Sequence, residues 1–151
     1  MPKQSAGILL YKKVKGQALF LLVHPGGPFF KNKDLGSWTI PKGEFDSDEE
    51  ALTAAKREFK EETGFDINGD FTQLKPITQK SGKTVYCWAV EGDIDASQIQ
   101  SNTFEIEWPP KTGKMLTFPE VDRAEWFDYD TAEQKINPAQ VGLLEEALQL
   151  I

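Results

Sequence analysis

The chain has 151 residues, a length typical of one domain whose core needs no disulfide for stability. Its 17 Lys and Arg against 24 Asp and Glu give a formal net charge of −7, which disfavours a broad basic surface for long nucleic acid or anionic lipid. If this acidic protein binds a phosphate-rich ligand, we expect metal cations to mediate the contact.

The single cysteine and the apolar runs restrict the class of protein. Cys87 cannot form an intramolecular disulfide, and its apolar neighbours indicate a packing role rather than a nucleophile. The N-terminal segment lacks a signal-peptide pattern, and no apolar run approaches the roughly 20 residues that span a bilayer. We therefore expect a single cytoplasmic domain over residues 1–151, a monomer or a homodimer, with no membrane partner.

The first third of the chain predicts two strands and a long loop. Short apolar runs at 7–11 and 19–23, separated by a polar connection, are typical of paired strands. Residues 25–36 contain a Pro-Gly-Gly-Pro run and predict a loop, and a loop of that length in a compact domain is usually functional. A short extended piece is predicted at 37–41, where Pro41 ends it.

A helix is predicted at 48–63. Ser47 and Glu50 have the spacing of a capping box, and Gly64 suits the left-handed residue that follows a helix. Three apolar residues repeat on one side of this helix: Leu52, Ala55 and Phe59.

The rest of the chain predicts further strands and a terminal helix. Runs rich in apolar and β-branched residues predict strands at 73–79, 84–91, 102–108 and 124–128. A Pro-rich connection occupies 109–119, and the last helix, 138–150, has Asn137 as its cap. This order of elements indicates an α+β fold or a layered α/β/α arrangement with a mixed sheet.

Three carboxylates share one side of the first predicted helix. At about 100° per residue, Glu58, Glu61 and Glu62 lie within an arc of roughly 100°, away from the apolar side. A cation would relieve the repulsion between them, and oxygen ligands without nearby His or Cys select Mg²⁺ or Mn²⁺ over zinc. Clustered glutamates alone are more often a solvated helix face. Arg57 is expected to orient a carboxylate through an ion pair rather than to face the metal.

A longer pattern surrounds these glutamates. Residues 43–65 match Gly-x5-Glu-x7-Arg-Glu-apolar-x-Glu-Glu-x-Gly-apolar at every fixed position. Seven such identities in register would arise by chance on the order of once in 10⁸–10⁹ start positions. The segment resembles the signature box of the Nudix hydrolases. That resemblance implies a Nudix-type α/β/α sandwich with a mixed β-sheet, and hydrolysis of a nucleoside diphosphate linked to another moiety.

The resemblance also implies roles for the residues of the box. Glu49 and Arg57 would hold the box loop and orient the glutamates, and Glu58 would help to deprotonate the attacking water. Glu61 is counted with Glu58 and Arg57 among the catalytic residues. Four residues would bind the metal, the first through its carbonyl: Gly43, Glu58, Glu61 and Glu62.

Two other stretches bear on the substrate. Residues 38–43, Trp-Thr-Ile-Pro-Lys-Gly, resemble the segment before the box in dinucleoside polyphosphate hydrolases, which makes Lys42 a candidate phosphate contact and diadenosine tetraphosphate the leading substrate. A His commonly follows the Gly in that subgroup, whereas this chain has Glu44. The segments 5–7 and 120–127 resemble a bacterial group described as predicted nucleoside triphosphate pyrophosphohydrolases.

Three functions therefore stay open. The first is a Mg²⁺-dependent hydrolase, possible also with Mn²⁺, of a small nucleotide such as diadenosine tetraphosphate. The second is a hydrolase that cleans the pool of (d)NTPs, and the third is a nucleotide-sensing domain without catalysis. Long nucleic acid is the least favoured ligand because the chain has no basic tract.

A further metal ligand or base in this family fold often comes from a later loop or strand. In the predicted strand 102–108, strict alternation places Glu105 and Glu107 on one face. We take Glu105 as the candidate catalytic residue, Glu107 as a substrate contact and Glu120 as the third candidate. An exposed strand face is the alternative for each of them.

Aromatic residues and the lone histidine complete the candidate substrate contacts. Nucleobases need stacking surfaces, and four aromatics lie in or beside loops: Phe29, Phe30, Tyr86 and Trp108. Each of these rings is more often part of a core. His24, at the end of the second predicted strand, is a candidate phosphate contact, although a lone histidine is more often a hydrogen-bonded structural residue.

Overall fold

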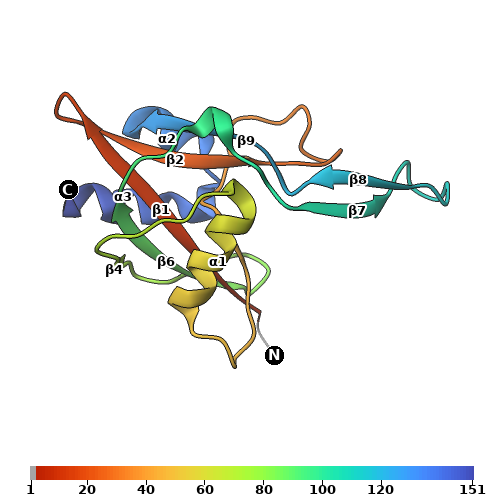
Figure 1. Ribbon diagram of the computed structural model, residues 1–151, viewed down its shortest axis with the longest axis horizontal. Helices are drawn as coiled ribbons and strands as arrows, with labels where there is room; N and C mark the ends of the chain where they lie inside the picture. Colours follow the sequence, from red (N-terminus) through yellow and green to blue (C-terminus); the bar gives the residue numbers. More distant parts are fainter. Residues whose placement is uncertain (1–2) are drawn as a thin grey trace.

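Strands dominate the computed structural model, which describes residues 3–151. The strands are β1 (Gln4–Val14), β2 (Gln17–Pro25), β3 (Lys42–Glu44), β4 (Thr72–Gln73), β5 (Ile77–Thr78), β6 (Thr84–Glu91), β7 (Thr103–Glu107), β8 (Met115–Pro119) and β9 (Val121–Asp128). The helices are α1 (Ala51–Thr63), α2 (Tyr129–Lys135) and α3 (Val141–Leu150), with short 3₁₀ helices at Ala96–Gln98 and Pro138–Gln140. Within these residues a seven-stranded sheet follows the order β4-β6-β1-β2-β9, with β3 paired to β1 and β5 to β6 (Figure 1).

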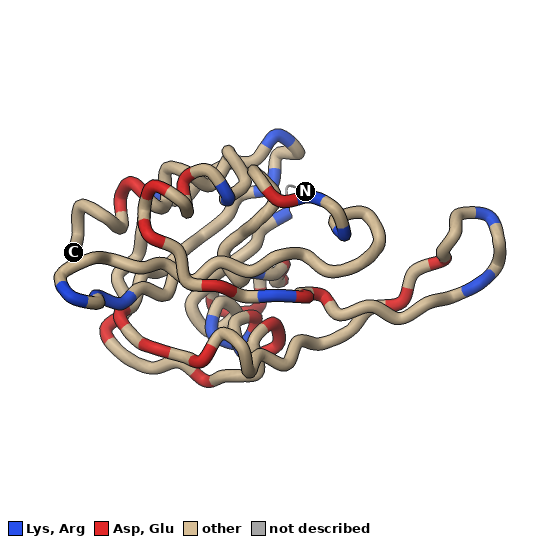
Figure 2. The backbone as a smooth tube through the Cα atoms, turned by 90° about the horizontal axis from the view of Figure 1, so that it is seen from above, with Lys and Arg blue, Asp and Glu red and all other residues tan. Residues whose placement is uncertain are grey.

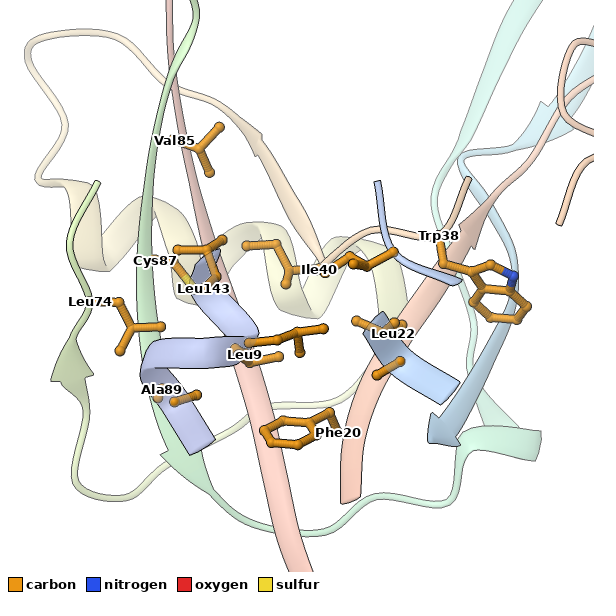
Figure 3. Packing of buried hydrophobic residues seen from close by; sticks show 14 residues of the cluster. Leu9, Phe20, Leu22, Trp38, Ile40, Leu74, Val85, Cys87, Ala89 and Leu143 are labelled. Atoms are coloured by element: carbon orange, nitrogen blue, oxygen red, sulfur yellow. The ribbon is translucent and has the colours of Figure 1, made fainter. Parts of the chain in front are cut away.

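Strand β1 lies in the middle of the sheet and contributes side chains to the cores on both faces. β1 runs parallel to β6 and antiparallel to β2 and β3, so the sheet is mixed. Successive side chains of a strand point to opposite faces, and β1 accordingly sends Leu9 into one hydrophobic core and Ile8 into another. Figure 3 shows the first core, in which Leu143 of α3 packs with Leu9 and Cys87.

Helices cover both faces of the sheet. Phe59 of α1 is fully buried in the core that contains Ile8, whereas Ala132 of α2 and Leu143 of α3 are buried in the core that contains Leu9. The sheet therefore lies between α1 and the pair α2 and α3. This arrangement confirms the predicted α/β/α sandwich with a mixed sheet.

Only the N-terminal boundary of α1 differs from the prediction. Gly64 has the expected left-handed conformation, with φ of 82°, and donates its N–H to the carbonyl of Lys60. The predicted start at 48 and the Ser47 capping box are wrong, because α1 begins at Ala51 and no side chain caps it. Residues 46–49 instead form a turn in which the N–H of Glu49 bonds to the carbonyl of Asp46.

Other boundaries were also missed. The single strand predicted at 73–79 is two short strands, β4 and β5, and α2 was not predicted. The terminal helix was predicted with its cap: the side chain of Asn137 accepts the N–H of Ala139, and α3 follows a 3₁₀ turn. No helix among residues 3–151 is both long and apolar enough to cross a membrane.

The connection predicted at 109–119 contains β8, which pairs with β7 to form a two-stranded hairpin. We call residues 103–119 the arm. It is separate from the main sheet and projects from the body of the molecule (Figure 1). The turn between its strands carries Lys111 and Lys114, and Figure 2 shows the basic positions at the tip of the arm.

Candidate metal centre and active site

Two glutamates of α1 meet a third from a distant part of the chain. One carboxylate oxygen from each of Glu58, Glu62 and Glu120 lies within 4.8 Å of the others. Glu58 and Glu62 are one helical turn apart on α1, and Glu120 lies between β8 and β9. We call these three residues the carboxylate cluster. It combines two glutamates of the sequence motif with Glu120, the third candidate for a metal ligand or base from the later part of the chain.

A glycine lets β3 approach the carboxylate cluster. A Cβ atom placed on Gly43 would lie 1.9 Å from Oε1 of Glu58, so no larger residue fits there while Glu58 keeps its position. Beside it, the backbone N–H of Lys42 donates to Oε1 of Glu62 at 3.3 Å. The structure thus places Gly43 directly against the cluster.

Arg57 donates hydrogen bonds to three carboxylates. Its Nε and Nη2 donate to the two carboxylate oxygens of Glu49 at 3.0 and 2.9 Å, and its Nη1 donates to Oε2 of Glu58 at 2.6 Å. The same Nη1 lies 3.3 Å from both carboxylate oxygens of Glu61. Arg57 therefore sits where it can orient acidic side chains. Glu61, predicted as a metal ligand, faces Arg57 and is not among the three oxygens that define the carboxylate cluster.

The carboxylate cluster holds negative charge in a poorly solvated place. Burial, and then the charge of Glu61, raises the pKa of Glu58 to about 7, although Arg57 acts in the opposite direction. Burial and the charges of Glu58 and Glu120 raise the pKa of Glu62 well above its ordinary value. The pKa of Glu120 is raised by burial and by Glu61. Each of these shifts means that a nearby cation would stabilise the ionised form.

The donor atoms of the cluster fit a hard divalent cation. All are carboxylate oxygens, and the group contains no His or Cys. Mg²⁺ and Mn²⁺ prefer such oxygens, whereas zinc sites in proteins usually include nitrogen or sulfur. The cluster therefore has the chemistry expected of a magnesium or manganese centre.

Lys42 supplies a cation next to the carboxylate cluster. Burial and the charge of Lys83 lower the pKa of its ammonium group, while Glu62, Glu44 and Glu58 act to raise it. A partly desolvated ammonium group at this position suits contact with phosphate oxygens. Its neighbour Glu44 is exposed and accepts from Nζ of Lys83 at 3.1 Å.

Backbone hydrogen bonds fix Glu120 in place. Its N–H donates to the carbonyl of Asn102 at 2.8 Å, and its carbonyl accepts from the N–H of Gly26 at 2.9 Å. The N–H of Asn102 in turn donates to the carbonyl of Glu61 at 2.8 Å. These bonds connect α1, the base of the arm and the loop 25–36 at one point beside the cluster.

The arm keeps two predicted residues out of the carboxylate cluster. Glu105 and Glu107 share a face of β7, as the alternation predicted, but β7 leaves the main sheet. The carboxylate of Glu107 accepts from the N–H groups of Lys111 and Gly113 and so closes the turn of the arm. Glu105 is exposed and pairs across the arm with Thr117. Neither residue belongs to the carboxylate cluster.

His24 has a structural position. It is buried, with Nδ1 2.8 Å from the carboxylate of Asp122 and Nε2 2.7 Å from the carbonyl of Lys33, and its ring lies edge-to-face with Trp38. Both ring nitrogens are occupied, so His24 is not free to bind phosphate. It instead fastens the loop 25–36 to β9.

Two other residues contribute to packing, Tyr86 at the edge of a core and Cys87 inside one. Tyr86 packs edge-to-face against Phe45, with ring centroids 6.2 Å apart, and joins the core beneath α1 rather than the carboxylate cluster. Cys87 is fully buried, and burial raises the pKa of its thiol, which agrees with a packing role.

Comparisons with known proteins place the chain in a family. The family model of the NUDIX domain matches residues 1–147. Among solved structures, an Ap4A hydrolase of C. elegans has 23% sequence identity and a TM-score of 0.66, covering 98% of this chain and 96% of that chain. The NUDIX domain of NrtR from Shewanella oneidensis, complexed with ADP ribose, has 18% identity and a TM-score of 0.68, covering 99% of this chain and 88% of that chain. At these identities the likeness shows the fold alone.

Curated relatives include viral decapping proteins. The mRNA-decapping protein g5R of African swine fever virus is 48% identical over 54 residues, covering 32% of this chain and 21% of the relative. A putative mRNA-decapping protein of Acanthamoeba polyphaga mimivirus is 29% identical over 116 residues, covering 69% of this chain and 28% of the relative. The chain thus spans less than a third of the length of either protein.

The family match covers nearly the whole chain, and it agrees with the α/β/α fold and with the motif at 43–65. The resemblance noted in the sequence is therefore confirmed. The chain belongs to the NUDIX domain family, whose hydrolases act on phosphoric anhydride bonds.

Proposed function

We propose that the protein is a Mg²⁺-dependent hydrolase of small nucleotides, active also with Mn²⁺, with diadenosine tetraphosphate as the leading substrate. One observation carries the proposal: the carboxylate oxygens of Glu58, Glu62 and Glu120 lie within 4.8 Å of one another. When ionised together, these carboxylates repel one another in a poorly solvated place, and a bound cation would remove that repulsion.

The side chains around the cluster have distinct parts in this proposal. Glu58, Glu62 and Glu120 would hold the metal, together with the carbonyl of Gly43. A bound divalent cation supplies charge stabilisation at a phosphoryl oxygen and lowers the pKa of a bound water. Arg57 keeps Oε2 of Glu58 in a fixed position through the 2.6 Å hydrogen bond.

Glu58 is also the proposed proton acceptor. A base must be ionised to accept a proton, and a cation bound at the cluster would keep the carboxylate of Glu58 ionised. Its Oε2 is bonded to Arg57, so Oε1, which faces Gly43, is the atom left to take a proton from the attacking water. Glu61, held by the same guanidinium group, is proposed to assist as an outer ligand or base.

The choice of substrate rests on Lys42 and on the fold comparison. The backbone N–H of Lys42 donates to Glu62, so its side chain starts beside the carboxylate cluster, where its ammonium group would contact the phosphates of a polyphosphate. The C. elegans structure that shares this fold is an Ap4A hydrolase, and residues 38–43 resemble the corresponding segment of dinucleoside polyphosphate hydrolases. Capped RNA is disfavoured as a substrate because the net charge of −7 repels a long polyanion.

Hydrolysis in ¹⁸O-labelled water with Mg²⁺ tests the proposal. Diadenosine tetraphosphate should give ATP and AMP, with the label in one of them. Deoxynucleoside triphosphates cleaved to a monophosphate and pyrophosphate, in preference to diadenosine tetraphosphate, would overturn the substrate and favour the pool-cleaning function. Metal-dependent binding without turnover on any nucleotide would favour a sensing domain.

A matched pair of variants tests the residue roles. Glu62→Gln removes one charge from the carboxylate cluster and should lower kcat by roughly 100-fold or more, as loss of an electrostatic group in a catalytic site does. Glu105→Gln makes the same chemical change on the exposed arm and should leave kcat unchanged. Equal activity of the two variants would refute the assignment of the cluster.

A further inference from the structure

Two aromatic rings meet at the surface where the arm and the loop 25–36 come together. Phe29, in the loop, is 56% exposed, and Trp108 follows β7 in the arm. Their ring centroids are 5.3 Å apart in an edge-to-face arrangement. Among residues 3–151, Phe29 is the one aromatic side chain that is exposed rather than buried or partly buried, and exposed aromatic surface often marks a binding site.

A short stretch of chain separates Phe29 from the carboxylate cluster. The N–H of Gly26 bonds to the carbonyl of Glu120, and Phe29 follows Gly26 by three residues, a reach of at most about 11 Å. Phe104 of the arm packs against the loop: a Cβ atom on Gly27 would lie 2.8 Å from its ring. Figure 1 shows the loop after β2 beside the base of the arm. The loop that carries Phe29 therefore starts beside the carboxylate cluster and packs along the base of the arm.

The other two candidate rings in loops are already occupied. The ammonium group of Lys33 lies over the ring of Phe30, 5.4 Å from its centroid. Tyr86 packs against Phe45 in the core beneath α1. Phe29 is thus the most exposed of these candidate rings, and Trp108 packs edge-to-face against it.

We propose that Phe29 and Trp108 form a stacking platform for a nucleobase of the substrate, while its phosphates lie at the carboxylate cluster. This inference rests on the proposed function and names the part of the substrate that the arm and the loop recognise. Every base has a flat π-face, so stacking recognises a nucleobase without selecting one base. The platform should therefore separate nucleotides from base-free polyphosphates rather than adenine from guanine.

Titration calorimetry with ATP and with inorganic tripolyphosphate, each in excess Mg²⁺, tests the platform without relying on turnover. In Phe29→Leu and in Trp108→Leu, the Kd of ATP should rise roughly 5- to 100-fold, as loss of base stacking on an aromatic ring predicts. The Kd of tripolyphosphate, which has no base, should stay within about twofold. The KM for diadenosine tetraphosphate should rise with the Kd of ATP, and kcat should change far less.

Phe30→Leu is the matched control, because it makes the same change at the neighbouring ring that Lys33 covers. It should leave both Kd values unchanged. Phe29 is exposed, so Phe29→Leu leaves the core intact and decides the question if Trp108→Leu fails to fold. A Kd of ATP in Phe29→Leu equal to that of wild type would overturn the platform, and so would equal weakening of ATP and tripolyphosphate.

Different results would overturn the proposed substrate and the stacking platform. A wild-type protein that binds ATP more tightly than tripolyphosphate through Phe29, but does not hydrolyse diadenosine tetraphosphate, would retain the platform and lose the proposed substrate. A protein that hydrolyses diadenosine tetraphosphate with the same KM in wild type and Phe29→Leu would keep the substrate and lose the platform.

Discussion

In the absence of divalent cations, raising the pH from 5.5 to 8 should destabilise this protein. Burial raises the pKa of Glu58 from 4.5 to about 7 in the folded state. The folded protein therefore holds this proton at pH values where the unfolded chain has lost it. The stability contributed by that proton is fully present below about pH 4.5 and is lost as the pH rises through about 7.

The size of the effect follows from the same shift. Glu58 is 7% exposed, so solvent screening reduces the effect little. The interval from pH 5.5 to the folded-state pKa of about 7 covers about 1.5 units at roughly 1.4 kcal/mol each, or about 2 kcal/mol lost by pH 8. The pKa values of Glu62 and Glu120 are also raised, which acts in the same direction. A carboxyl group whose pKa is lowered in the folded state, such as that of Glu49, stabilises the protein above about pH 4.5. Its contribution is lost only at pH values below the interval from 5.5 to 8.

Urea denaturation at pH 5.5 and pH 8, in EDTA and then in Mg²⁺, measures this loss. In EDTA the free energy of unfolding should fall by at least about 2 kcal/mol between the two pH values, and the fall should be smaller in Glu58→Gln by about the share of Glu58. Mg²⁺ should stabilise the protein more at pH 8 than at pH 5.5, because protons compete with the metal for the carboxylates. A wild-type stability in EDTA that stays level or rises over this interval would refute the reasoning, as would the same fall in Glu58→Gln.

Three further substitutions test the surroundings of the site. Gly43→Ala forces Glu58 from its position, so the affinity for Mn²⁺, followed by electron paramagnetic resonance, should fall roughly 10-fold or more, and wild-type affinity would contradict the close packing. Arg57→Lys keeps the charge but loses the paired hydrogen bonds, so kcat should fall roughly 10- to 100-fold; unchanged kcat would exclude a positioning role. His24→Leu leaves the partners of both ring nitrogens, Lys33 and Asp122, without a hydrogen bond and should cost about 1–3 kcal/mol in urea denaturation, whereas a wild-type midpoint would argue against the structural role.

The helical part of the site could be predicted because its spacing is local. Glu58 and Glu62 are four residues apart, which in a helix places both on one side, and the left-handed Gly64 marks the end of that helix. Arg57 lies next to Glu58, and its ion-pairing position also follows from proximity along the chain.

The sequence pattern ranks Glu120 below Glu105 and Glu107 because the position of Glu120 depends on tertiary structure. Its place in the cluster requires backbone bonds to Asn102 and Gly26, which lie far from it in the sequence. The run of alternating residues around Glu105 gave a stronger local signal, but alternation indicates which side chains share a face and not which sheet the strand joins. The apolar run at 115–118, followed by Val121, was the available sign of a strand pair ending at Glu120.

At the N-terminal boundary of α1, a local capping pattern competes with an ion pair. Ser47 and Glu50 have capping-box spacing, but Glu49 between them pairs with Arg57 through two hydrogen bonds. That pairing accompanies a turn at 46–49, and α1 begins only at Ala51. A tertiary ion pair in the signature segment has thus replaced the local cap.

Mn²⁺ titration of three glutamine variants is the most direct test of the claim that Glu58, Glu62 and Glu120 bind a divalent cation. Glu62→Gln and Glu120→Gln should each weaken Mn²⁺ binding by at least about 10-fold, while Glu105→Gln, on the exposed arm, should bind as wild type does. Wild-type affinity in Glu120→Gln together with a large loss in Glu105→Gln would contradict the account and move the metal from the α1 cluster to the arm.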